Sequence, residues 1–178
     1  TCRKKTGLAY SISTDSDIFL YDVETKETRN LCKPADYQAP AVEPTKSLST
    51  QGVNQQAADY NLGYDTNPKF SPDGRYLAWL SMERDGYESD RNRLCIYDLR
   101  EETKSYITES FDSGVDDYGW APYSNTLYFI SVWHGTENLY KTNLKGGVKQ
   151  LTKDLADFGS LQVISNTMLL AERHSFIE

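Results

Sequence analysis

The sequence lacks the features that mark a membrane protein or a nucleic-acid-binding protein. No apolar run in its 178 residues is long enough to span a bilayer as a helix. Basic residues are not in surplus either, because 19 Lys and Arg stand against 26 Asp and Glu, for a net charge of −7. A protein that binds nucleic acid needs a basic face. We therefore expect neither a nucleic-acid partner nor a membrane partner.

Cysteine is also scarce, and its spacing does not suggest a metal site. The three cysteines are Cys2, Cys32 and Cys95, an odd number without the spacing of metal ligands. We expect buried free thiols; the alternative is a Cys2–Cys32 disulfide, which would require an oxidising compartment. The N-terminus has no initiator Met and no basic region followed by an apolar one, so no targeting signal is visible.

Aromatic residues, by contrast, are plentiful, and they occur within repeats. The chain has 13 Tyr and 3 Trp, residues that suit a pleated, half-buried surface. One pattern recurs three times: a short strand ending near a Tyr, a charged or Gly-containing turn, and a second short strand. The copies are residues 17–32, 93–108 and 138–152. Each copy predicts a β-hairpin.

A second repeated unit precedes the later hairpins. Residues 67–82 align with residues 117–132, and a weaker copy spans residues 157–172. The first copy contains the string Ser71-Pro72-Asp73-Gly74, in which each residue type has a known role in a tight turn. Nearly continuous apolar runs at 77–80 and 127–130 predict strands that neighbouring elements cover on both faces.

Two hairpins per repeat make four antiparallel strands, the pattern of a β-propeller blade. We therefore predict an all-β fold, a partial β-propeller that forms an open arc of about three blades. The predicted units are a partial blade (1–32), a long irregular insertion (33–66), two complete blades (67–109 and 110–153) and a second partial blade (154–178). A closed propeller needs roughly four to eight blades, so this arc cannot close alone.

In a propeller, the loops that join the second and third strands of each blade emerge on one face, which makes their side chains candidates for ligand binding. The candidates on this face are Glu83, Arg84, Glu88, Trp133, His134, Arg173 and His174. The alternatives are a solvated hairpin tip with weak local ion pairs at residues 83–88 and a Trp133 that packs against the adjacent blade. We expect no metal site, and we interpret residues 15–17 as a turn because they lack the glycine and final Glu of a calcium loop.

Several strings resemble a known family. The string NPKFSPDGRYLAWLSMERDGYESDRNRLCIYDL (residues 67–99) resembles the non-catalytic propeller of prolyl oligopeptidase family serine peptidases, in the branch of bacterial dipeptidyl peptidases and acylaminoacyl-peptidases. ISVWHGTENLY (residues 130–140) and Arg173-His174-Ser175 fit the same branch. The resemblance covers about residues 1–176. It implies a parent protein with an N-terminal propeller and a C-terminal α/β-hydrolase domain that cleaves short peptides with a Ser-Asp-His triad.

The resemblance also implies what this chain itself does. It contains no G-x-S-x-G, so we expect no catalytic residue, no cofactor and no activity in the isolated fragment. The implied partners are the hydrolase domain and short peptides whose access the propeller gates, with self-association through exposed blade faces as a further expectation. The implied location is periplasmic or secreted, and a cytoplasmic location stays open.

Exopeptidases of this kind need an anion for the free amine of the peptide, and residues 83–88 supply carboxylates. The sequence lacks the tandem Glu-Glu helix motif of well-known dipeptidyl peptidases, so the resemblance assigns that role to no particular residue. Two other functions compete with this one. The first is a TolB-like or WD-repeat-like propeller used for protein–protein binding, although the Gly-His and Trp-Asp pairs of WD repeats are absent. The second is a carbohydrate- or lyase-type propeller enzyme.

Overall fold

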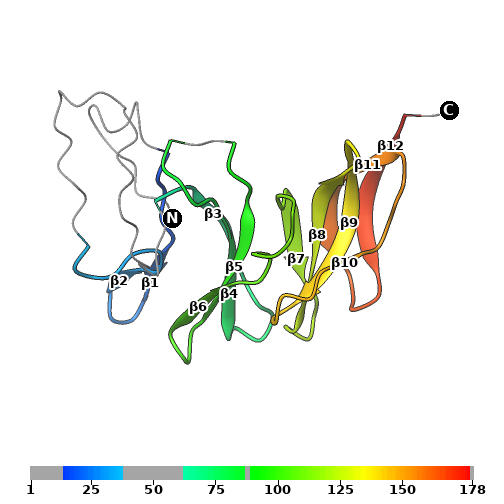
Figure 1. Ribbon diagram of the computed structural model, residues 1–178. Helices are drawn as coiled ribbons and strands as arrows, with labels where there is room; N and C mark the ends of the chain where they lie inside the picture. The colour runs from blue at the N-terminus through cyan, green and yellow to red at the C-terminus, as the bar shows by residue number, and fades with distance from the viewer. Residues whose placement is uncertain (1–13, 38–61, 87–88, 177–178) are drawn as a thin grey trace, which may run out of the picture.

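The chain folds as a row of antiparallel sheets (Figure 1), seen in a computed structural model that describes residues 14–37, 62–86 and 89–176. Within those ranges every regular element is a strand. Helices that could cross a membrane are accordingly absent from the described part of the chain.

Four sheets follow one another along the sequence, and we number them as blades. The first blade contains β1 (Phe19–Tyr21) and β2 (Thr28–Asn30). The second contains β3 (Asp65–Phe70), β4 (Tyr76–Ser81), β5 (Arg93–Asp98) and β6 (Thr103–Tyr106). The third contains β7 (Asp117–Trp120), β8 (Thr126–Trp133), β9 (Thr136–Asn143) and β10 (Lys149–Gln150). The fourth contains β11 (Ala156–Val163) and β12 (Leu169–Ser175).

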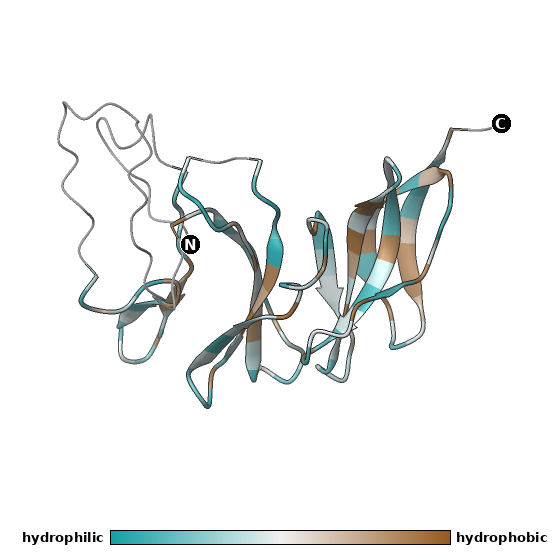
Figure 2. Cartoon of the chain, viewed as in Figure 1, coloured by the Kyte–Doolittle hydropathy of each residue, from teal (hydrophilic) through white to brown (hydrophobic). Residues whose placement is uncertain are grey.

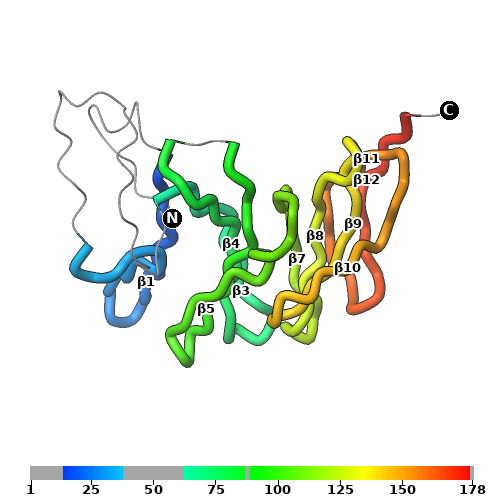
Figure 3. The backbone as a smooth tube through the Cα atoms, viewed as in Figure 1, coloured from blue at the N-terminus to red at the C-terminus, as the bar shows by residue number. Residues whose placement is uncertain are grey.

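The strand order confirms the predicted fold class. The second and third blades are four-stranded antiparallel sheets in which each strand pairs with its neighbour in the sequence. The first and fourth are two-stranded. The tube in Figure 3 shows the chain completing one sheet before it moves to the next, and the sheets do not close into a ring. The fold is a partial β-propeller.

Alternation along the central strands explains how each blade packs on both sides. In the second blade Leu77, Trp79, Cys95 and Tyr97 point towards the first blade, and the residues between them point towards the third. This period of two is the geometry of a strand, whose successive side chains lie on opposite faces. Figure 2 shows the apolar residues concentrated on the strands and the hydrophilic ones on the connecting loops. The apolar run at 77–80 is therefore buried on both faces, as predicted.

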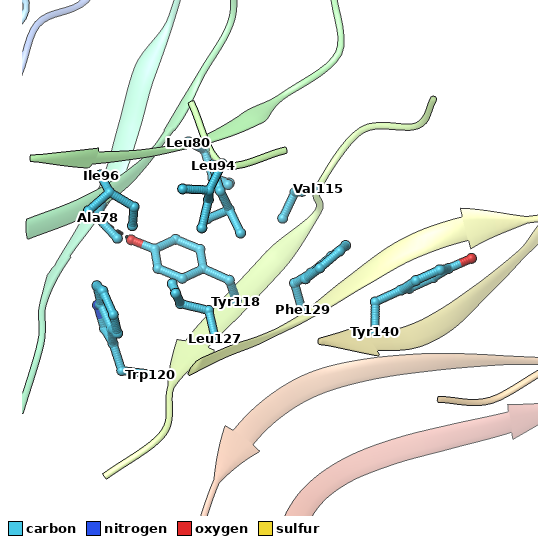
Figure 4. Packing of buried hydrophobic residues seen from close by; sticks show 11 residues of the cluster. Ala78, Leu80, Leu94, Ile96, Val115, Tyr118, Trp120, Leu127, Phe129 and Tyr140 are labelled. Carbon is cyan, nitrogen blue, oxygen red and sulfur yellow. Dashed lines mark hydrogen bonds between the residues drawn. The ribbon is translucent and has the colours of Figure 1, made fainter. Parts of the chain in front are cut away.

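The contact between the second and third blades centres on Tyr118 (Figure 4). Its fully buried ring lies among Leu94, Ile96 and Leu127, and its hydroxyl lies 2.8 Å from the carbonyl oxygen of Ala78 across the contact. A buried phenol needs such an acceptor, because an unsatisfied hydroxyl in an apolar core is costly. The aromatic cluster thus carries a polar bond that links the two blades.

Two innermost strands contain a β-bulge that the sequence repeat did not predict. The ladder of β3 shifts register between Thr66 and Lys69, and that of β11 shifts between Gly159 and Gln162. The bulges contain Asn67 and Ser160, each with φ of 54°, a left-handed value that is uncommon outside glycine. No such shift interrupts the pairing of β7 with β8.

Candidate functional site

The candidate site lies on the face of the arc that is uppermost in Figure 1, which we call the upper face. It carries the described residues of the β4–β5 loop (82–86 and 89–92), the β8–β9 turn and the end of β12. Residues 14–17, which we call the anchor segment, precede β1 and contact the β4–β5 loop. Rigid strands beneath fix these loops, the usual arrangement for binding residues.

The β4–β5 loop encloses a hollow of about 500 Å³. Pockets for small ligands are commonly of this size. Glu83, Arg84, Ser89, Asp90, Arg91 and Arg93 line the hollow. Two of the predicted site residues, Glu83 and Arg84, therefore lie together. A third, Glu88, lies outside the described residues.

Arg93 is a fixed positive charge at the edge of this hollow. It is the first residue of β5, and its side chain is only 8% exposed. The guanidinium lies 4.3 Å from the ring centroid of Tyr106, and its Nη1 is 3.0 Å from Oε2 of Glu109. The same nitrogen lies 3.7 Å from Oε2 of Glu83. Since 59% of the Glu83 side chain is exposed, its carboxylate faces solvent while a buried cation lies next to it.

Arg84 is occupied by an ion pair within the loop. Its Nε donates to both carboxylate oxygens of Asp90 at 3.0 Å, and its backbone N–H donates to Oδ2 at 2.9 Å. These hydrogen bonds from Arg84 lower the pKa of Asp90 below its ordinary value. The bidentate geometry closes the loop, so Arg84 stabilises the loop. The side chains of Arg84 and Glu83 are both exposed, and the arginine is held by Asp90.

Asp85 ties the same loop to the first blade. Its Oδ1 accepts hydrogen bonds from the backbone N–H of Thr14 at 2.7 Å and of Asp15 at 3.1 Å. In return the N–H of Gly86 donates to Oγ1 of Thr14 at 2.7 Å. The loop therefore rests against the anchor segment, although some 70 residues separate them in sequence.

The anchor segment is not the turn that its sequence predicts. Ser16 forms a parallel bridge with Tyr64, and its two neighbours hold a buried lysine. The Lys33 Nζ lies 2.6 Å from Asp15 and 2.7 Å from Asp17, and the lysine side chain is 4% exposed. Burial alone would lower the pKa of Lys33, but its hydrogen bonds to the two aspartates outweigh burial and raise it. The prediction was wrong because the partners, Lys33 and Tyr64, are distant in sequence.

One cluster of potential metal ligands includes Asp17, the last residue of the anchor segment. Among the residues that the structure describes, Asp17, Cys32 and Asp65 bring one ligand atom each within 4.8 Å of one another. The donor set does not fit a metal ion. Lys33 supplies the cation beside Asp17, and the backbone N–H of Ile18 donates to the Cys32 Sγ at 3.1 Å. Burial raises the pKa of the Cys32 thiol far above its ordinary value, which disfavours the thiolate that a metal requires.

The two cysteines that the structure describes have the predicted state. Cys32 and Cys95 are buried free thiols in the cluster between the first and second blades. Cys2 lies outside the described residues.

Trp133 and His134 lie on the third blade, at the tight turn between β8 and β9. His134 and Gly135 have φ of 51° and 82°, the left-handed values of a two-residue hairpin turn. The His134 ring lies 4.4 Å from that of Trp133, which is half-buried against the central apolar cluster. These contacts favour a structural role, and a substrate-facing role for the pair stays a prediction.

Arg173 and His174 lie on the fourth blade, near the end of β12. The Nε of Arg173 is 3.6 Å from Oδ2 of Asp154, and Nε2 of His174 is 3.8 Å from Oε2 of Glu172. Both side chains are exposed. The structure thus distributes the predicted site residues over three blades. Only Glu83 and Arg84 share a hollow among those that it describes.

Sequence reasoning missed Arg93 and the tie through Asp85. Arg93 directly precedes the apolar residues 94–97 in the sequence, a position that the solvated end of a loop would also occupy, so its burial had no local signal. Asp85-Gly86 resembles an ordinary turn pair. That Asp85 would bind Thr14, a residue distant in sequence, could be known only once the two blades were seen side by side.

Comparison with known proteins adds a separate line of observation. No protein-family model matches the chain. It is 40% identical over 175 residues to dipeptidyl-peptidase 5 of Porphyromonas gingivalis and 39% identical over 176 residues to that of Porphyromonas endodontalis. Each alignment covers 98% of this chain but only 22% of the relative, so the chain spans about a fifth of their length.

A solved structure shows the same fold at low identity. The β-propeller domain of the Trilobed protease from Pyrococcus furiosus, whose description reports an open velcro topology, superposes with a TM-score of 0.56. The match covers 91% of this chain and 38% of that one, at 16% identity. At this identity the likeness supports the fold alone.

Proposed function

Since this chain is a β-propeller fragment homologous to dipeptidyl-peptidase 5 proteins, we propose that it gates the access of short peptides to a C-terminal α/β-hydrolase domain in a longer chain. The open row of blades and the small share of each relative that the chain spans support a fragment of a larger protein. The charged loops of the upper face supply the polar surface that a peptide would meet.

We further propose that Glu83 binds the free α-amine of the peptide. An enzyme that removes dipeptides must distinguish a free N-terminus from an internal peptide bond, and a carboxylate binds an ammonium group by charge-assisted hydrogen bonds. The observation that carries this proposal is the accessible Glu83 carboxylate in the 500 Å³ hollow. Nη1 of Arg93 lies 3.7 Å from Glu83, and Arg84 is engaged by Asp90. Of the described carboxylates that line the hollow, Glu83 is therefore the one without an arginine in hydrogen-bonding contact.

The test compares two substrates of the longer protein: a chromogenic dipeptide with a free amine and its N-acetylated form. Glu83→Gln should lower kcat/KM for the free dipeptide on the order of 10- to 100-fold, the loss expected for one charged hydrogen bond. The slow turnover of the acetylated form should not change.

Glu109→Gln is the matched control. Glu109 also contacts Arg93, but it does not line the hollow, so its loss disturbs the arginine without removing the proposed amine ligand. An unchanged ratio between the two substrates in Glu83→Gln would remove Glu83 from the proposal. A longer reading frame without G-x-S-x-G would instead favour a propeller used only for protein binding.

A further inference from the structure

We propose that Asp85 is a positioning residue that fixes the Glu83 carboxylate by tying the β4–β5 loop to the neighbouring blade. This inference rests on the proposed role of Glu83 as the amine ligand. It adds that the orientation of this ligand depends on the contact between the first and second blades, and not on the loop alone.

The contacts of Asp85 cross from one blade to the next. Its carboxylate accepts hydrogen bonds from two consecutive backbone N–H groups of the anchor segment, those of Thr14 and Asp15. In the other direction, the backbone N–H of Gly86 donates a hydrogen bond to the Thr14 hydroxyl. Hydrogen bonds in both directions fix both the distance and the rotation of the loop relative to the first blade.

The start of the loop, directly after β4, is held by the segment that leads into β3. The N–H of Leu62 donates to the Glu83 carbonyl at 3.3 Å, and the N–H of Met82 donates to the Tyr64 carbonyl at 2.7 Å. Gly63, between Leu62 and Tyr64, lies so close to the backbone of Met82 that a Cβ at this position would be 2.5 Å from the Met82 carbonyl oxygen. Glu83 therefore lies between a backbone contact on one side and the tie through Asp85 on the other.

Asp90 binds a residue of its own loop, whereas Asp85 binds the anchor segment. The Arg84–Asp90 pair closes the loop on itself and would keep its geometry wherever the loop moved. Asp85, by contrast, accepts its backbone bonds from the anchor segment, which the buried Lys33 holds in turn. Loss of Asp85 should thus free the loop to shift as a unit and carry Glu83 with it.

The experiment uses the longer protein and the ratio of kcat/KM for the free dipeptide to that for its N-acetylated form. Asp85→Ala should lower this ratio about tenfold, because a displacement of about 1 Å can cost that much or more. Asp85→Asn should keep most of the ratio, since the amide oxygen can still accept from Thr14 and Asp15. A general loss of folded enzyme would lower both rates together and leave the ratio unchanged.

Two further variants keep the test decisive. Asp22→Ala is the matched control. Asp22 also accepts two backbone hydrogen bonds at 2.8 Å, but both come from within one turn of the first blade. The ratio of the two kcat/KM values in this variant should therefore equal that of the unaltered protein. Thr14→Val removes the hydroxyl that accepts from Gly86 and donates to Asp85 at 3.5 Å, while both backbone bonds to Asp85 remain, and it should lower the ratio about threefold. This variant tests the tie if Asp85→Ala does not fold.

The outcomes separate this inference from the function on which it rests. A parental ratio in Asp85→Ala, with a lowered ratio in Glu83→Gln, would overturn the positioning role and leave the amine ligand in place. Equal losses in Asp85→Ala and Asp85→Asn would also overturn it, because positioning through accepted bonds requires the amide to rescue. A parental ratio in Glu83→Gln would overturn both proposals.

Discussion

The second blade packs against a neighbour on each side, and the two contacts differ in chemistry. Towards the third blade lies an aromatic and aliphatic cluster of eleven buried residues, with Tyr118 at its centre. Towards the first blade the apolar cluster has seven, and beside it lie the buried Lys33 with its two aspartates and the carboxylate of Asp65.

Adjacent blades of this chain are thus joined in two ways, one mainly by apolar burial and the other partly by buried charges. Burial of apolar surface is favourable but non-directional. It makes up most of the contact with the third blade, which a few directional bonds supplement, among them those of Tyr118 to the Ala78 carbonyl and of Trp120 to the Lys69 carbonyl. Buried charges lose hydration energy and recover it only in a defined geometry. The charged contact lies under the β4–β5 loop, where the placement of Glu83 depends on it.

The largest effect should come from the apolar contact. Tyr118→Ala removes a fully buried ring and the bond to Ala78, and we expect the free energy of unfolding to fall by about 4 kcal/mol. Chemical denaturation of this chain measures it. Tyr123→Ala is the control, because that side chain is 77% exposed in a nearby turn and its loss should change stability by less than about 0.5 kcal/mol. Similar values for both variants would contradict the proposed importance of this core.

A somewhat smaller effect should come from the charged contact. Lys33→Met leaves Asp15 and Asp17 partly buried without their cation, and we expect a loss of about 3 kcal/mol. Adding Asp15→Asn and Asp17→Asn should restore part of that stability, because the uncompensated charges then disappear. Lys153→Met, at an exposed lysine, should be nearly neutral. If the triple variant were less stable than Lys33→Met alone, charge imbalance would not be the cause.

The smallest effect should be a dependence on pH that arises from Asp65. Burial raises the pKa of this carboxyl above its ordinary value of 3.8, although hydrogen bonds from Ser81, Cys32 and Trp79 oppose the shift. Between the ordinary and the raised value the folded state binds the proton more readily, so this contribution to stability is present at low pH and is lost as pH rises through the raised pKa. Asp65→Asn removes the titration.

Denaturation curves over a pH series would show that effect as a difference between variants. The stability of Asp65→Asn relative to the unaltered chain should increase as pH rises through that range. Asp98→Asn should show the opposite pH dependence. Hydrogen bonds from Arg75 lower the pKa of Asp98, so the stabilisation that this carboxylate gives is lost as pH falls, and the stability of the variant relative to the unaltered chain should increase in that direction. A relative stability of Asp65→Asn that is constant with pH would show that the carboxyl titrates normally.

The fold was predictable because its signals are local and repeated. Apolar runs such as 77–80 predict strands covered on both sides, and Gly74, with φ of 70°, occupies the position that the Ser-Pro-Asp-Gly turn requires. The bulge at Ser160 left only an indirect trace: Gly159 follows Gly119 by 40 residues, whereas Asn166 follows Asn125 by 41. A one-residue offset between two aligned motifs is what an extra residue in one strand produces.

The candidate site was predictable only in part. That the β4–β5 loop carries accessible charge follows from its composition and from the rule that such loops share one face. Which of these charges is left for a ligand does not follow from the sequence, since Arg84 and Glu83 are both exposed and the pairing of Arg84 with Asp90 is seen only in the structure. The partners of Asp85 and of the anchor segment are set by the placement of one blade against another, a relation between residues far apart that no local pattern encodes.

The bridge at Ser16 and the ion pairs of Lys33 have a practical consequence for engineering. The chain leaves the first blade at Lys33 and enters the second at Tyr64, and both residues contact the same anchor segment. The intervening stretch therefore starts and finishes at neighbouring points that are fixed independently of it. Doubling the length of such a connection costs only about 0.6 kcal/mol in closure entropy. A reporter domain inserted there should therefore leave the packing of the two blades unchanged.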